Sequence, residues 1–268
     1  MIAVRSLTLS LSLALAATVG ADTFKPSKAD QVKLGKDAAK QVRQKYKVLP
    51  SSDERVRVLR RAASRILATF DDGKEPWDYS FDVIDSKEIN AFALPGGPTF
   101  FFTGLLNRMK TEDELAAVLA HELVHVRREH WAYQYADSQK RNLGLSLILI
   151  LARANRSIVD LASVGNSLYD LQFSRGHETQ ADEQGMDALV SAGYNPQGMV
   201  DVFTMLSQTS KGGRPPEFLS SHPNDANRIK NIERRSASMG KSFPAQRPLP
   251  WSSGTYSSVR AGLRWNWR

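Results

Sequence analysis

Hydrophobic residues recur at helical spacing in two segments near the start of the chain, residues 28–47 and 53–70. Three shorter segments follow, in which apolar residues alternate with polar ones or form short β-type runs; they cover residues 77–85, 89–94 and 99–104. Proline and glycine separate the last two of these segments, which is typical of a turn. The pattern predicts two helices followed by a small sheet of three or four strands.

The pattern farther along the chain is helical again. Thr111, with Glu114 three positions later, fits a capping box that starts a helix expected to run to about Gln139. Apolar residues lie on most sides of this helix, which indicates a buried central element. Further helices are expected over 157–192, 197–208 and 223–236, the last with Pro223 in its first turn. The predicted fold class is therefore α+β and mostly helical.

The two ends of the chain differ from its middle. Arg5 precedes a run of small and apolar residues that is short for a membrane span, which is typical of a secretion signal cut near Ala21–Asp22. An uncleaved anchor is the alternative. The chain is expected to be exported and to divide into a signal (1–21), a folded domain (22–238) and a basic tail (239–268).

Two further segments are distinctive. Residues 259–268 alternate between apolar and basic side chains, which predicts a strand that packs on the domain's own sheet or contacts a membrane surface or partner. Residues 143–152 are strongly apolar but too few to cross a membrane, so we expect them in the core or as a flap over a groove.

Composition narrows the chemistry. The absence of cysteine excludes disulfides, thiolate metal sites, a cysteine nucleophile and a lipid-modified N-terminal cysteine. The protein is therefore not expected to be a lipoprotein, and any metal must be held by histidine and carboxylate. The net charge of +8 is spread along the chain, which indicates a solvated basic surface rather than a nucleic-acid site.

The sequence HELVH at residues 121–125 is the main candidate for chemistry. His121 and His125 would share one face of a helix and could bind one ion. Glu122 projects about 100° away from His121, where it reaches water beside the ion rather than the ion itself. Two ligands and a general base are the parts of a site for metal-assisted hydrolysis. The alternative, a pair of surface histidines, is disfavoured by the apolar residues around them, because buried imidazoles need partners.

A catalytic zinc keeps three protein ligands and one open position, so a further ligand is required. Arg128 and Trp131 stand where a metzincin would have glycine and histidine, which excludes that class. Glu178 and Asp182 share one face of a separate predicted helix. Glu178 could bind the ion while Asp182 accepts the proton from the far nitrogen of a ligand histidine. The neighbouring histidine, His177, is a rival ligand that points about 100° away from Glu178.

Four motifs in order resemble the HtpX-like and CAAX-protease-like family of zinc endopeptidases, in its soluble, exported bacterial branch of BepA-like and LoiP-like members. These motifs are NAFALPGG at 90–97, HELVH at 121–125, ETQAD at 178–182 and SHPND at 221–225. The resemblance covers roughly residues 30–236. It implies a zincin-like domain in which a small, edge-exposed sheet packs on the HExxH helix.

The resemblance also implies roles for single residues. One zinc per chain would be held by His121, His125 and Glu178, with Glu122 as the base. His222 would lie near the metal and either stabilise the oxyanion or occlude the site; its alternative role is an N-cap before Pro223. Arg228 would contact substrate or support the ligands, and Asn90, Ala91 and Phe92 would form an edge strand along the substrate cleft.

The expected function is a zinc endopeptidase that cleaves unfolded or misassembled exported proteins in the periplasm, with extended polypeptides as its partners. A pairing of substrate with an exposed edge strand would select extended chains, because main-chain hydrogen bonds read backbone rather than sequence. The alternative is a zinc-containing binding or chaperone-like protein whose site is held shut. Hydrolysis of non-peptide amides is supported by the generic motif alone. Neither the repeat domains nor the membrane spans of some relatives are visible in the sequence.

Overall fold

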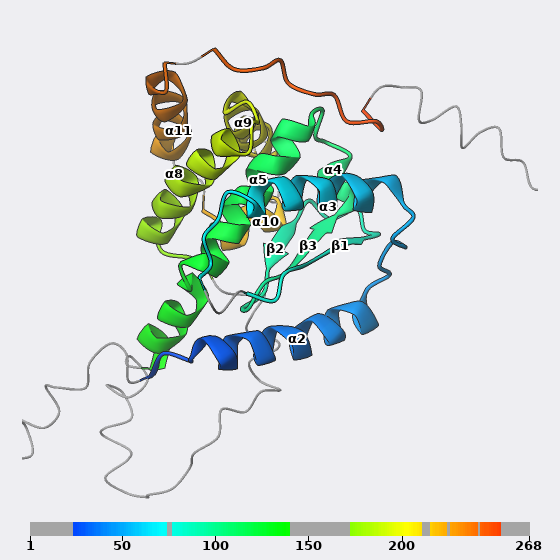
Figure 1. The fold of residues 1–268 in the computed structure, drawn as a ribbon, viewed down its shortest axis with the longest axis vertical. Coiled ribbons are helices and arrows are strands. Elements are labelled where there is room, and N and C mark those ends of the chain that lie inside the picture. The colour runs from blue at the N-terminus through cyan, green and yellow to red at the C-terminus, as the bar shows by residue number, and fades with distance from the viewer. Residues whose placement is uncertain are drawn as a thin grey trace, which may run out of the picture.

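The computed structural model describes residues 24–73, 77–139, 172–210, 215–223, 226–240 and 242–252 (Figure 1). The predicted signal at 1–21, the apolar run at 143–152 and the predicted strand at 259–268 lie outside the described residues. None of the helices within the described ranges is both long and apolar enough to cross a membrane.

Two amphipathic helices, α2 (Lys28–Lys45) and α3 (Glu54–Leu67), open the described part of the chain. Ser27 caps α2 in a reciprocal capping box with Asp30, and Asp53 caps α3 by accepting the N–H of Arg55. These contacts satisfy backbone donors that a helix start leaves unpaired. Both predicted helices are confirmed, with ends two or three residues shorter than the pattern suggested.

A three-stranded sheet follows, with β1 (Ser80–Ile84), β2 (Ala91–Ala93) and β3 (Pro98–Phe102) in the order β1-β3-β2. β3 pairs in parallel with β1 and antiparallel with β2, and all five of its residues are buried. α2 packs on one face of the sheet, while α3 and α5 lie on the other (Figure 1). In this strand order β2 is an edge strand, as predicted, and the mostly helical α+β class is confirmed.

The central helix α5 (Glu112–Arg127) follows the short α4 (Thr103–Leu106) and is buried from Glu112 through Val126. Thr111 caps it by accepting the N–H of Glu114, but the Glu114 carboxylate accepts the N–H of Lys110 instead of completing the box. The prediction that this helix continues to Gln139 is wrong. Glu129 adopts a left-handed conformation with φ 54°, which ends the helix, and residues 130–139 form a new helical segment.

The remaining helices are α8 (Arg175–Ser191), α9 (Gln197–Ser210), α10 (Glu217–Ser221) and α11 (Ala226–Ser238). The prediction of one helix over 157–192 is wrong at residues 172–174, which are not helical; Ser174 instead caps α8 by accepting the N–H of His177. α10 was not predicted, and α11 begins three residues after Pro223 rather than around it.

α5 lies against α3, α8 and α9, so other helices pack on the sides of α5 that the sheet does not cover (Figure 1). Two glycines permit this close packing. A Cβ on Gly185 of α8 would lie 3.2 Å from the backbone nitrogen of His121, and a Cβ on Gly198 of α9 would lie 2.5 Å from the carbonyl carbon of Asp113. α8 therefore approaches the backbone of α5 at the first histidine of HELVH.

Residues 242–252 cross the start of α5. The N–H of Glu112 donates to the carbonyl of Arg247 (2.7 Å), and the N–H of Leu249 donates to the carbonyl of Lys110 (2.8 Å). The Asp113 carboxylate accepts the N–H of Arg247 (2.8 Å) and of Asn195 (2.7 Å). The acidic first turn of α5 is thus held by backbone donors, which fixes the end of the helix away from HELVH.

The tight contact at Gly198 predicts a selective loss of stability. We expect Gly198→Ala to force α9 away from α5 and to lower the free energy of unfolding by about 2 kcal/mol or more, because backbone atoms block the added methyl group. Gly176 is the matched control: it is also the second residue of its helix, but an added Cβ there meets nothing nearer than the Ser174 hydroxyl at 3.8 Å. Gly176→Ala should keep the stability or raise it by up to about 1 kcal/mol. Urea unfolding measures both, and equal effects would contradict the packing argument.

Candidate metal centre

Four side chains from three helical elements meet in the interior. His121 and His125 come from α5, Glu178 from α8 and His222 from the C-cap of α10. Each is buried, and one ligand atom from each lies within 4.8 Å of the other three. His222 follows a helix and does not cap the next one, so the N-cap alternative for this residue is wrong.

The donor atoms face one another at short distances. Nε2 of His121 lies 3.1 Å from Nε2 of His125 and 3.2 Å from Nδ1 of His222. Oε1 of Glu178 lies 2.9 Å from Nδ1 of His222 and 3.3 Å from Nε2 of His125. Imidazole nitrogen and carboxylate oxygen are the donors that zinc takes when thiolates are absent. The donor set therefore fits zinc.

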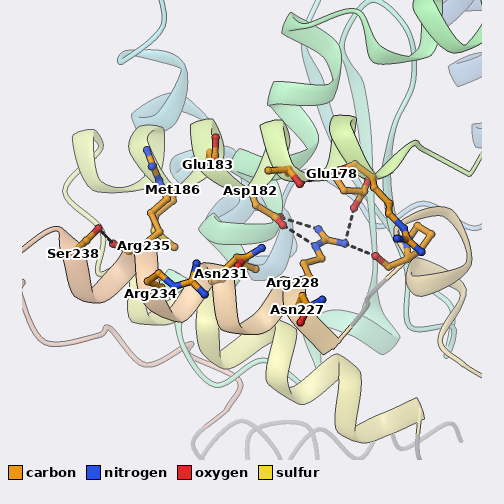
Figure 2. A pocket seen from close by; sticks show the side chains of 14 residues that line it. Glu178, Asp182, Glu183, Met186, Asn227, Arg228, Asn231, Arg234, Arg235 and Ser238 are labelled. Atoms are coloured by element: carbon orange, nitrogen blue, oxygen red, sulfur yellow. Dashed lines mark hydrogen bonds and ion pairs between the residues drawn. The ribbon is translucent and has the colours of Figure 1, made fainter.

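Two further residues support these donors. Asp182, one turn after Glu178 on α8, places Oδ1 3.0 Å from Nδ1 of His121. Arg228 of α11 donates to both oxygens of Asp182 at 2.7 and 2.8 Å, and its NH1 lies 2.6 Å from Oε2 of Glu178. Figure 2 shows the guanidinium between the two carboxylates, in the wall of a pocket between α8 and α11. NH1 also donates to the carbonyls of His222 and Pro223, so each of the three guanidinium nitrogens of the buried Arg228 is engaged with a protein group.

The electrostatics of this cluster favour a cation. Burial alone would raise the pKa values of Glu178 and Asp182, but His222 and Arg228 hold the pKa of Glu178 well below its usual range, and Arg228 and His121 lower that of Asp182. Burial would lower the pKa of His222, but Glu178 and Glu122 raise it. The negative charge that favours a protonated histidine here would equally favour a metal cation, because buried charges require compensation.

Glu122 lies beside the four donors without belonging to the group. Its Oε2 accepts the backbone N–H of Ala93 at 3.0 Å, and its Oε1 lies 3.3 Å from Nε2 of His222. Burial raises the pKa of Glu122 above its ordinary value. A carboxylate with a raised pKa accepts a proton more readily near neutral pH, which suits a general base.

The predicted substrate strand lies directly against this carboxylate. The Asn90 carbonyl accepts the N–H of Phe102, and the Leu94 N–H donates to the Pro98 carbonyl, so these groups face β3. In an antiparallel ladder the intervening residues Ala91 and Ala93 direct their polar groups to the opposite side. The Phe92 ring packs on Phe100 and Phe102, toward α2 and away from the metal group.

Sequence reasoning missed two residues at this centre. His130 is buried and places Nδ1 3.0 Å from Nδ1 of His125, and Phe173 packs its ring on His125 with centroids 4.0 Å apart. Burial lowers the pKa of His130 to about 4, so its ring is neutral at pH 7. A spacing of five residues points to different sides of a continuous helix, so only the break at Glu129 could have revealed His130. The rival ligand His177 stacks on His130 and is not one of the four donors.

Comparison with known proteins agrees with this geometry. Residues 51–236 match Peptidase family M48. The mitochondrial metalloendopeptidase OMA1 of Schizosaccharomyces pombe is 33% identical over 206 residues, which cover 75% of this chain and 59% of that protein. The beta-barrel assembly-enhancing protease of Escherichia coli K12 is 31% identical over 171 residues, covering 60% of this chain and 35% of that protein.

A third relative is similar over most of its length. The metalloprotease LoiP of Escherichia coli K12 is 27% identical over 230 residues, which cover 82% of this chain and 87% of that protein. This chain therefore spans most of LoiP but only 59% and 35% of the two other relatives. The match to the family covers more than half of the chain and includes all four donors. The chain belongs to peptidase family M48, whose members are zinc-dependent metalloendopeptidases.

Proposed function

We propose that this protein is a zinc endopeptidase that binds one zinc ion per chain through His121, His125 and Glu178. The observation that supports it most directly is the buried group of four facing donor residues. Three protein ligands leave one position for water or substrate, as in other catalytic zinc sites.

Bound zinc supplies Lewis acidity, which makes a water molecule acidic near neutral pH and polarises the carbonyl of the scissile peptide bond. Glu122 takes the proton from that water and returns it to the departing amine. The Ala93 N–H holds the carboxylate toward the edge of β2, so the base lies where a paired substrate would pass. Asp182 and Arg228 orient the ligands: Asp182 contacts His121, and Arg228 bridges Asp182 and Glu178. The engagement of Arg228 with protein groups favours this role over direct contact with substrate.

His222 occupies the remaining side of the donor group, and its placement bears on regulation. Nδ1 of His222 lies as close to His121 and Glu178 as the other ligands do. A fourth protein ligand there would fill the position that water needs, so we infer that the arrangement in the structure is a closed form of the site. When displaced from the metal, the same ring would be near enough to the reacting centre to stabilise an oxyanion.

The proposed substrates are extended segments of unfolded or misassembled exported proteins in the periplasm. An edge strand next to the base could pair with a chain of many sequences, but only where that chain is not already folded. The names of the two Escherichia coli relatives support this proposal, because one is a beta-barrel assembly-enhancing protease and the other a metalloprotease.

The competing function is a zinc-containing binding protein that rarely cleaves. The position of His222 is the observation that favours it, because a site with four protein ligands is typical of structural zinc. The two functions differ in whether the chain needs Glu122.

Replacing the base separates chemistry from metal binding. We expect Glu122→Gln to reduce casein cleavage by a factor of at least about 10³ while one zinc per chain is retained, because Glu122 removes a proton but does not bind the ion. Metal analysis and a casein digestion assay measure both quantities. Undiminished cleavage by the variant would refute the mechanism, and a wild-type chain without zinc would refute the site.

Replacing His222 tests the closed form. We expect His222→Ala to increase the rate of casein cleavage several-fold, on the order of 3 to 10 times, because one coordination position is freed for water. Initial rates at saturating zinc measure this effect. A fall in kcat would instead indicate that His222 stabilises the oxyanion, and it would contradict the closed form.

The state of the substrate provides a further test. One exported protein is presented in two forms: native, or reduced in denaturant that is then removed so that the chain stays unfolded. We expect the unfolded form to be cleaved faster by about tenfold or more, because pairing with the edge strand requires a free backbone. Gel analysis of a time course gives both rates. Equal rates would rule out selection by chain extension.

A further inference from the structure

A buried histidine outside the proposed ligand set contacts one of the ligands. His130 places Nδ1 3.0 Å from Nδ1 of His125, and its other ring nitrogen, Nε2, lies 2.8 Å from Oε1 of Gln180 on α8. The His130 ring is 1% exposed. Neither ring nitrogen of His130 faces the four donor atoms, so His130 contacts the metal centre only through Nδ1 of His125.

The proton positions along this chain follow from the need for a lone pair at the metal. Nε2 of His125 faces the other donors, so the proton of that ring must be on Nδ1. Nδ1 of His125 then donates to Nδ1 of His130, which requires the proton of His130 to be on Nε2. That N–H in turn donates to the Gln180 carbonyl oxygen. Each ring nitrogen of His125 and His130 then has one partner, and this series of hydrogen bonds needs no buried charge.

The backbone break after α5 makes this contact possible. In a continuous helix, five residues turn the chain by about 500°, which would place the ring of residue 130 roughly 140° around the helix from His125. The left-handed Glu129 redirects the chain and returns His130 to the ligand. The Glu129 carboxylate is held by Gln31 (2.7 Å) and Lys25 (2.9 Å), so the unusual conformation is anchored from the start of the described chain.

We propose that His130 is a positioning residue, which fixes the ring orientation and the proton of His125 as Asp182 does for His121. Gln180 completes the arrangement by fixing the tautomer of His130. The two ligands of HELVH are thus oriented differently, one by a carboxylate and the other by a neutral imidazole. Partners of this kind commonly change metal affinity by about 10- to 100-fold. The inference rests on the proposed zinc site.

Two substitutions at position 130 separate the hydrogen bond from packing. His130→Phe keeps a buried ring but removes the acceptor, and we expect zinc affinity to fall by about tenfold or more. His130→Asn offers an amide oxygen near the place of Nδ1 and should recover zinc affinity to within about threefold of the wild type. The control is His177→Phe, which keeps the stacking on His130 and removes an imidazole that is not a donor; its zinc affinity should match the wild type.

Competition with a chromogenic chelator measures zinc affinity, and the visible spectrum of the cobalt-substituted full chain reports the geometry of the ligands. We expect the cobalt bands to shift in His130→Phe and to return in His130→Asn, a rescue that a packing defect would not produce. Wild-type affinity and spectrum in His130→Phe would overturn the inference and leave the zinc site standing. So would equal losses in both variants at position 130. A wild-type chain that binds no zinc would overturn the inference together with the proposed function.

Discussion

The contact between α5 and α8 governs the whole centre, because it sets two histidines of one helix against two carboxylates of the other. Gly185 lets the helices approach until α8 lies against the backbone of His121. The cost is that Glu122, Glu178 and Asp182 lose water together, with Arg228 as the principal protein cation among them. A divalent ion bound by the proposed ligands would offset part of this negative charge, and it would couple folding of this interior to binding of metal.

Much of this arrangement was available from the sequence, because it depends on local periodicity. The four-residue spacings of His121 with His125 and of Glu178 with Asp182 each define one helix face, and any folded form must keep those pairs together. The short apolar run at 89–94 predicted a strand, whereas its edge position was implied by the family resemblance. What the spacing could not supply was the distance between the two pairs, which depends on how closely the two helices pack.

The parts that escaped prediction depend on single backbone conformations or on tertiary neighbours. Nothing in the apolar pattern indicates that Glu129 is left-handed, since its side chain is ordinary and its anchors, Lys25 and Gln31, are about a hundred residues away. In a continuous helix His130 would lie on a different side from His125, so the break at Glu129 is what brings it to the centre. His222 was expected near the metal from resemblance, but its position at the end of α10 comes from a five-residue helix too short to leave a periodic signal.

The hydrogen bond from Ala93 to Glu122 has a consequence for which peptide bond is presented to the metal. Its N–H is already committed to the carboxylate, so a strand lying along β2 would find the polar groups of Ala91 and the carbonyl of Ala93, but no donor at this one step. A carbonyl of the guest chain at that step would have no hydrogen-bond donor on β2. The position of the cut would then be set by the backbone register of the substrate against Ala93. Substrate side chains would change how long the substrate stays bound, but not which peptide bond is cut.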